Sequence, residues 1–207
     1  MSQHAAPAIG DTRTRPRWSS WGGGALLVGG LALLVATVVE YFVWQTTTLE
    51  TGLFIVFSIL FLANIVLYLV AMPALAFADG GIAGGSVIGR VGLVLFGAGW
   101  AVGQVIYWSS YFVGSLPSAL DVLGTVALVV TYVGAIAAAV VIAIGRVAAG
   151  VARWALLVGL AVGAVCAGIA NAVSDQLLTT VLLSVSCAAQ ALVGLVYLRT
   201  PARRRTA

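Results

Sequence analysis

The chain has 207 residues, of which 62% are hydrophobic and only 8% are charged. A soluble domain needs about 25% charged residues to cover its surface, so this composition excludes a water-soluble protein and indicates one that faces lipid. The net charge of +4 comes from Arg without any Lys. The Arg residues cluster beside apolar segments, which argues against nucleic acid as a partner. Arg alone, with abundant Ala, Gly and Val, is typical of a GC-rich bacterial genome.

The first 21 residues form a polar tail that contains Arg13, Arg15 and Arg17. The apolar run that follows is about twice as long as the core of a cleavable signal peptide. We therefore expect this run to remain in the membrane as the first span.

Six apolar runs are each long enough to cross the bilayer core, which takes about 20 helical residues. Their uniform apolarity favours helices over the alternating strands of a membrane barrel, and a helix satisfies its own backbone hydrogen bonds in lipid. The predicted fold class is an all-α polytopic membrane bundle of six transmembrane helices at 22–198, followed by a basic tail at 199–207. The predicted spans are 22–44, 52–75, 91–113, 118–144, 154–173 and 177–198.

Every Arg lies on one side of this predicted topology. The positions are Arg13, Arg15, Arg17, Arg90, Arg146, Arg153, Arg199, Arg203, Arg204 and Arg205. The opposite side contains Glu50, Asp121 and Asp175 and no basic residue. Because Arg-rich connections stay in the cytoplasm, we expect a multi-pass protein of the cell's inner (plasma) membrane with both termini cytoplasmic.

A weak internal repeat links the first and last pairs of spans. ALLVG occurs at Ala25 and at Ala155, and YLVAMPA at Tyr68 resembles YLRTPA at Tyr197. Three related helical hairpins would produce this pattern, and so would chance in a chain rich in Ala, Gly, Leu and Val.

The longest predicted connection contains ADGGIAGGSVIG, at 78–89. It lacks the Lys-Ser/Thr ending and the preceding strand of a phosphate-binding loop. Its glycines instead predict a flexible cytoplasmic linker.

Two pairs of glycines have the GxxxG spacing inside predicted spans: Gly99 with Gly103, and Gly159 with Gly163. Small residues let helices approach closely in lipid. The pairs predict either a homodimer interface or contacts within one bundle. With six helices to pack, contacts within the bundle are favoured.

Glu40 is the only acid well inside a predicted span. A charge at the bilayer centre costs about 2.5–3.5 kcal/mol on insertion scales, and less towards the interface, so we expect Glu40 to face other helices or water. Gln104, Tyr107 and Asn171 also lie in the outer halves of their spans, and Asp175 follows Asn171 by four residues, just beyond the fifth span. Convergence of these faces would form an outward-facing vestibule for a cation or small polar solute. The alternative is that no cavity forms, because the aromatic residues lie at the membrane interface and the polar residues form hydrogen bonds between helices.

The sequence lacks the usual elements of cofactor chemistry. The only His is His4, in the polar tail, which argues against a haem, zinc or copper site within the membrane. HExxH and nucleotide-binding patterns are absent. Cys166 and Cys187 lack CxxC spacing and are expected to be buried free thiols. We expect no metal, no cofactor and no enzymatic activity.

Two functions are consistent with these features. The first is a channel or transporter for a cation or small polar solute. The second is a non-transporting accessory subunit or scaffold, whose partners besides the lipid bilayer would be a homo-oligomer or a larger membrane complex. Polar stripes in five of the six predicted spans favour the first.

Overall fold

The structure is a computed structural model that describes residues 16–46, 52–113, 117–145 and 147–200. Each described segment is dominated by long helices. The elements are η1 (Trp18–Gly23), α1 (Gly24–Trp44), α2 (Gly52–Phe77), η2 (Ala78–Gly80), α3 (Val87–Val113), α4 (Ser118–Ile144), α5 (Ala152–Ala172) and α6 (Gln176–Leu198).

All six α-helices are long and apolar enough to span a membrane, which confirms the predicted bundle of six transmembrane helices. The boundaries agree closely with the predicted spans. The α-helix bounds differ from the predicted ones by at most two residues, except that α3 begins at Val87 instead of Val91. The protein is therefore a multi-pass membrane protein.

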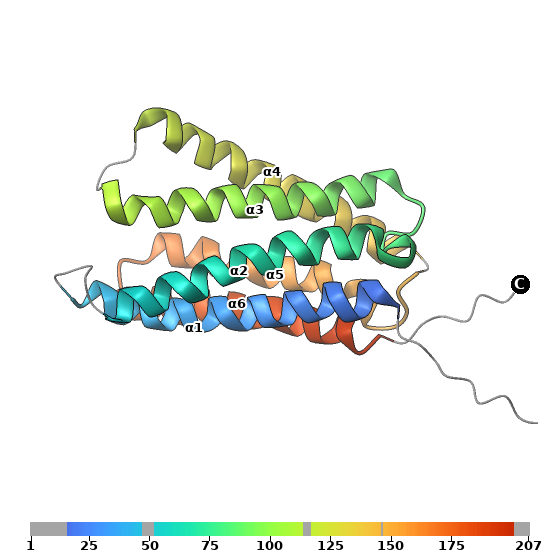
Figure 1. The fold of residues 1–207 in the computed structure, drawn as a ribbon, viewed down its shortest axis with the longest axis horizontal. Coiled ribbons are helices and arrows are strands. Elements are labelled where there is room, and N and C mark those ends of the chain that lie inside the picture. The colour runs from blue at the N-terminus through green and yellow to red at the C-terminus, as the bar shows by residue number, and fades with distance from the viewer. Residues whose placement is uncertain (1–15, 47–51, 114–116, 146, 201–207) are drawn as a thin grey trace, which may run out of the picture.

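The helices form a ring in which each packs against the next and α6 closes on α1. Consecutive helices run antiparallel as the hairpins α1–α2, α3–α4 and α5–α6. Contact is smallest between α4 and α5, and Figure 1 shows α4 diverging from α5 towards the N-terminal end of α4. Whether the three hairpins are related by duplication stays a prediction.

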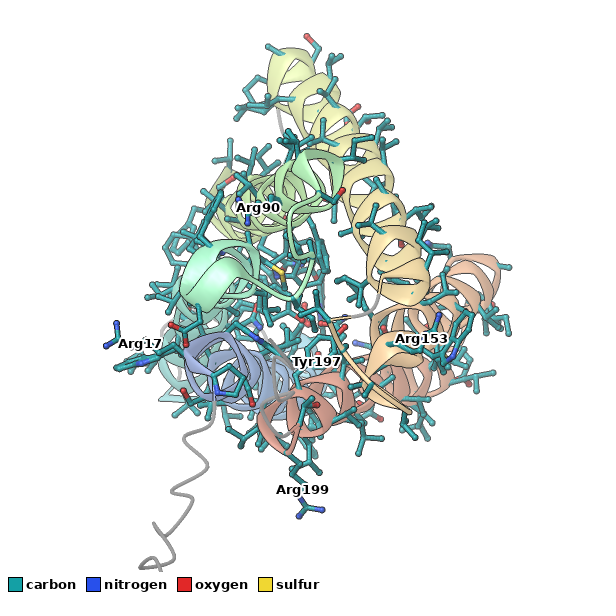
Figure 2. All side chains as sticks on the ribbon, turned by 90° about the vertical axis from the view of Figure 1, so that its right-hand side faces the viewer. Arg17, Arg90, Arg153, Tyr197 and Arg199 are labelled. Carbon is teal, nitrogen blue, oxygen red and sulfur yellow. The ribbon has the colours of Figure 1, made fainter. Side chains whose placement is uncertain are left out.

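The two ends of the bundle differ in the charged residues that they carry. The end shown in Figure 2, where odd-numbered helices begin and even-numbered helices end, carries Arg17, Arg90, Arg153 and Arg199; we call it the arginine end. Towards the opposite, acidic end lie Glu40, Asp121 and Asp175. The predicted positions Arg13, Arg15, Arg146, Arg203, Arg204, Arg205 and Glu50 lie outside the described residues.

Packed side chains close the arginine end. They belong to η1, α2, the α2–α3 connection, α4 and α6, and each is at most 4% exposed: Trp18, Leu75, Ile82, Ile142 and Tyr197. Figure 2 shows Tyr197 near the centre of this end. The Ser19 hydroxyl donates to the Tyr197 carbonyl oxygen at 2.7 Å. The same carbonyl oxygen accepts from the Thr200 backbone N–H at 3.1 Å, so Ser19 adds a second hydrogen bond to the C-terminal turn of α6.

The connection between α2 and α3 is a folded turn and differs from the flexible linker that its glycines predict. Gly81 has a φ of +70°, and a Cβ there would lie 2.0 Å from the Ala76 carbonyl oxygen. Arg90 Nε donates to the Gly84 carbonyl oxygen at 2.9 Å, and Ile82 is buried. The glycines serve left-handed backbone conformations and close approach.

Three of the four glycines in the predicted GxxxG pairs lie in contacts within the bundle. A Cβ at Gly99 would be 2.6 Å from Thr131 Oγ1 on α4. On α5, a Cβ at Gly159 would be 2.5 Å from Val193 Cγ2, and one at Gly163 would be 3.2 Å from Ser186 Oγ. Gly103 differs, because no described atom lies within 4 Å of its Cβ position.

Close helix contacts also occur at glycines outside those pairs. A Cβ at Gly194 of α6 would lie 2.3 Å from the Leu27 backbone nitrogen of α1. Gly92 and Gly134 bring α3 and α4 together, with each Cβ position 2.7 Å from the other residue's carbonyl oxygen. These glycines set the spacing of the ring around its interior.

Candidate solute-binding cavity

A cavity of about 460 Å³, which we call the inner cavity, lies inside the ring and is lined by residues from all six helices. On α1 its wall extends from Leu26, near the arginine end, to Glu40, near the acidic end. The 14 steps from Leu26 to Glu40 correspond to about 21 Å at 1.5 Å per residue. The inner cavity is therefore elongated along the helices.

A second space of about 290 Å³, the outer vestibule, adjoins the inner cavity at the acidic end. Both spaces are lined by the same four residues of α1, α3 and α6: Thr37, Glu40, Tyr107 and Leu183. Residues near the ends of α1 and α6, including the exposed Trp44 and Gln176, complete the outer vestibule. Glu40 thus stands at the junction between the inner cavity and the surface.

Two tyrosines of α3 hold the Glu40 carboxylate. Tyr107 and Tyr111 both donate their hydroxyls to Glu40 Oε1, and the two hydroxyl oxygens are 3.5 Å apart. Their i, i+4 spacing places both rings on one face of α3. No described residue donates to Oε2, and the described arginines occupy the opposite end of the bundle. The described part of the chain therefore provides hydrogen bonds to this carboxylate and no cation.

Two polar residues lie one helical turn from this group: Thr37 precedes Glu40 on α1, and Gln104 precedes Tyr107 on α3. Gln104 lines the inner cavity one turn before Tyr107, and its amide makes no hydrogen bond to a described residue. Thr37, one turn before Glu40, donates to the Leu33 carbonyl oxygen at 2.9 Å. Gln104 is therefore a polar group near Glu40 that remains available to a ligand.

A second polar network lies deeper in the bundle, around Asn64 and Tyr68 of α2. The buried Asn64 donates to the Gly29 carbonyl oxygen at 2.9 Å and accepts from Trp100 Nε1 at 3.2 Å, so it joins α1, α2 and α3. The Tyr68 hydroxyl donates to Gln190 Oε1 on α6. The Tyr68 ring stacks on Trp100, with ring centroids 5.3 Å apart. These bonds hold four helices around the inner cavity.

Most of the remaining inner-cavity wall is apolar. Thr131 adds little polarity, because its hydroxyl donates to the Ala127 carbonyl oxygen at 2.7 Å. The larger apolar side chains on the wall are Leu26, Leu33, Phe61, Phe96, Leu128, Leu156, Leu160, Leu183 and Val193. Sequence reasoning missed these residues, because their side chains have the same character as those that face lipid.

The structure brings together three of the five residues predicted for the vestibule. Glu40, Gln104 and Tyr107 line the inner cavity, whereas Asn171 and Asp175 line neither space. Asp175 is the N-cap of α6, where its Oδ1 accepts from the Leu178 backbone N–H at 2.7 Å. Asn171 is exposed on α5. Helix capping accounts for the Asp175 side chain. The outer vestibule is lined by residues of α1, α3 and α6, and not by the α5 residue that the sequence predicts.

Cys166 and Cys187 are free and buried, which confirms the expectation of unpaired thiols. Cys187 contacts α1, where its Sγ is 3.7 Å from Thr37 Oγ1. Within the described segments, no three His, Cys, Asp or Glu residues form a group that could hold a metal ion.

Comparison of the chain with protein-family models, with curated proteins and with solved structures finds no match. Function must therefore be inferred from the geometry of the inner cavity and of Glu40.

Proposed function

We propose that the protein is a transporter of a small polar or cationic solute, which enters the inner cavity from the acidic end past Glu40. The observation that carries this proposal is one cavity, lined by all six helices, that reaches the surface beside Glu40 and stops at packed side chains. Transport moves the solute without a chemical step.

The closure of the arginine end favours a carrier over an open channel. On α6 the wall of the inner cavity stops at Val193, and the fully buried Tyr197 lies one turn further on. A carrier exposes its central site to one side of the membrane at a time. With the arginine end in the cytoplasm, as its basic residues predict, the structure corresponds to an outward-facing state. Opening inward requires Trp18 and Tyr197 to separate from the helices around them.

A pooled-solute efflux assay tests the proposal on many candidate substrates at once. Purified protein is reconstituted into liposomes loaded with a mixture of amino acids, amines, sugars and organic cations, and retained solutes are quantified by mass spectrometry. We expect at least one solute to leave faster than from protein-free liposomes, and we expect Glu40→Gln to abolish the difference.

Asp121→Asn is the matched control, because Asp121 is an exposed acid towards the same end that lines neither space. This variant should transport like the wild type. Equal retention of every solute with and without protein would overturn the proposal. Stoichiometric co-purification with a larger membrane protein would then favour the accessory-subunit alternative.

A further inference from the structure

We infer that the solute is an amphipathic organic cation, with its positive centre beside Glu40 and its apolar body in the inner cavity. This inference rests on the proposed transport function and specifies its substrate class. Three features of the site support it: an unneutralised carboxylate, aromatic rings around it, and apolar walls beyond it.

The carboxylate selects for positive charge. Among the described residues, Glu40 is the only acid that lines either space, and no described Arg lies near it. A charge in a low-dielectric site without a counterion is costly, and a bound cation relieves that cost. Both tyrosine hydroxyls donate to Oε1, which leaves Oε2 free of described protein donors. An anionic solute would instead meet repulsion at this junction.

Two aromatic rings contact the same carboxylate, and two more pack against them. The Tyr107 ring centroid lies 5.9 Å from that of Tyr111, with the planes at 90°, and 5.9 Å from that of Phe61. Trp44, which lines the outer vestibule, lies 5.6 Å from Tyr111 between ring centroids. Ring faces attract organic ammonium groups, as in the recognition of quaternary ammonium ligands by aromatic cages. A carboxylate among rings therefore suits an organic cation.

The apolar walls favour a bulky organic cation over a metal ion. Cations such as Ca²⁺ need about six to eight oxygen ligands, whereas beyond Glu40 the wall consists mainly of Leu, Phe, Ala and Gly residues. A cavity of about 460 Å³ falls within the size range of sites for drug-sized organic molecules. Its elongated shape places an apolar body along the helices while the positive centre stays beside Glu40.

The inner cavity also reaches the side of the bundle between α4 and α5. Leu128 of α4, which is 55% exposed, and the exposed Ala164 of α5 both line it. Contact between these helices is the smallest in the ring, and α4 diverges from α5 towards the N-terminal end of α4 (Figure 1). Amphipathic cations partition into the bilayer, whereas hydrophilic solutes do not. A solute of the first kind can therefore reach Glu40 from the lipid.

Calorimetric titration with two probes of similar shape tests the inference. Tetraphenylphosphonium is an apolar cation, and tetraphenylborate is its anionic counterpart. We expect purified wild-type protein in detergent to bind the cation and not the anion. Tetramethylammonium, which lacks a large apolar body, and Na⁺ should not displace the bound cation at equal concentration.

Glu40→Gln should weaken tetraphenylphosphonium binding by roughly 30-fold or more, the effect of truncating one partner of a buried charge pair. Asp121→Asn should bind like the wild type. Equal binding of the two probes by the wild type would overturn the inference, and this comparison does not depend on how any variant folds. Absence of cation binding in a protein that moves a neutral solute from the pooled liposomes would overturn the inference alone. Absence of both binding and efflux would overturn the proposed function as well.

Discussion

At the scale of single residues, the polar side chains inside the bundle perform two different tasks. Asn64 and Tyr68 join helices to one another, because their hydrogen bonds end on Gly29, Trp100 and Gln190. Glu40 and Gln104 keep polar atoms without described protein partners and line the inner cavity. The first group should govern stability and the second should govern solute binding.

Asn64→Leu tests the structural group. The substitution removes two interhelical hydrogen bonds and leaves the Trp100 N–H without its acceptor. Since interhelical bonds contribute on average about 0.6 kcal/mol each, we expect a loss of roughly 1–2 kcal/mol in the free energy of unfolding, measured by denaturant titration in mixed micelles. Asn171→Leu, at an exposed position on α5, should change stability little. Similar losses in the two variants would contradict this assignment.

The sequence predicts the residues of the site unevenly, for physical reasons. Glu40 is conspicuous because charge is rare within a span, and Gln104 and Tyr107 share one face of a helix. Asn171 and Asp175 have the same polar character, but the rotation of α5 and the capping role of Asp175 depend on tertiary packing. Leu33 and Leu128 could not be recognised, because an apolar cavity wall and a lipid-facing surface use the same side chains.

At the scale of helices, the spans follow from hydropathy and their pairing follows from small residues. The six spans are predictable because each one covers the bilayer core with apolar side chains. Pairing is less predictable, because close approaches also occur at Gly194, Gly92 and Gly134, which are not in the GxxxG pairs read from the sequence. The positions facing each glycine are defined only once the helices are assembled.

Gly194→Ala tests the α1–α6 contact. Its Cβ would lie 2.3 Å from the Leu27 backbone nitrogen, so the two backbones must separate. Overpacking typically costs about 1–3 kcal/mol, and we expect a loss in that range in the free energy of unfolding in micelles. Gly103→Ala, whose Cβ meets no described atom within 4 Å, should be neutral or stabilising, because Ala favours a helix over Gly by about 1 kcal/mol. The reverse order would show that α1 and α6 pack differently.

At the scale of the whole molecule, the structure combines one closed end with one accessible end. Ser19, Trp18 and Tyr197 join the start and the end of the bundle, while the acidic end leads past Glu40 into the inner cavity. The order of residues in the sequence predicts a membrane bundle and the sorting of charge between its ends. It does not predict that the interior is hollow, which depends on the divergence of α4 from α5.

The most direct test of the account is the access of water to Gln104. A single cysteine is introduced as Gln104→Cys with Cys166 and Cys187 changed to Ala, and intact cells are exposed to a membrane-impermeant maleimide. The control is Val105→Cys, the adjacent position, which is 48% exposed and lines neither space. Thiols in hydrocarbon stay protonated and react poorly. We predict labelling of Gln104→Cys from outside the cell and none of Val105→Cys. Equal labelling of the two, or failure of the reagent to reach Gln104→Cys from outside, would contradict an outward-facing solute cavity.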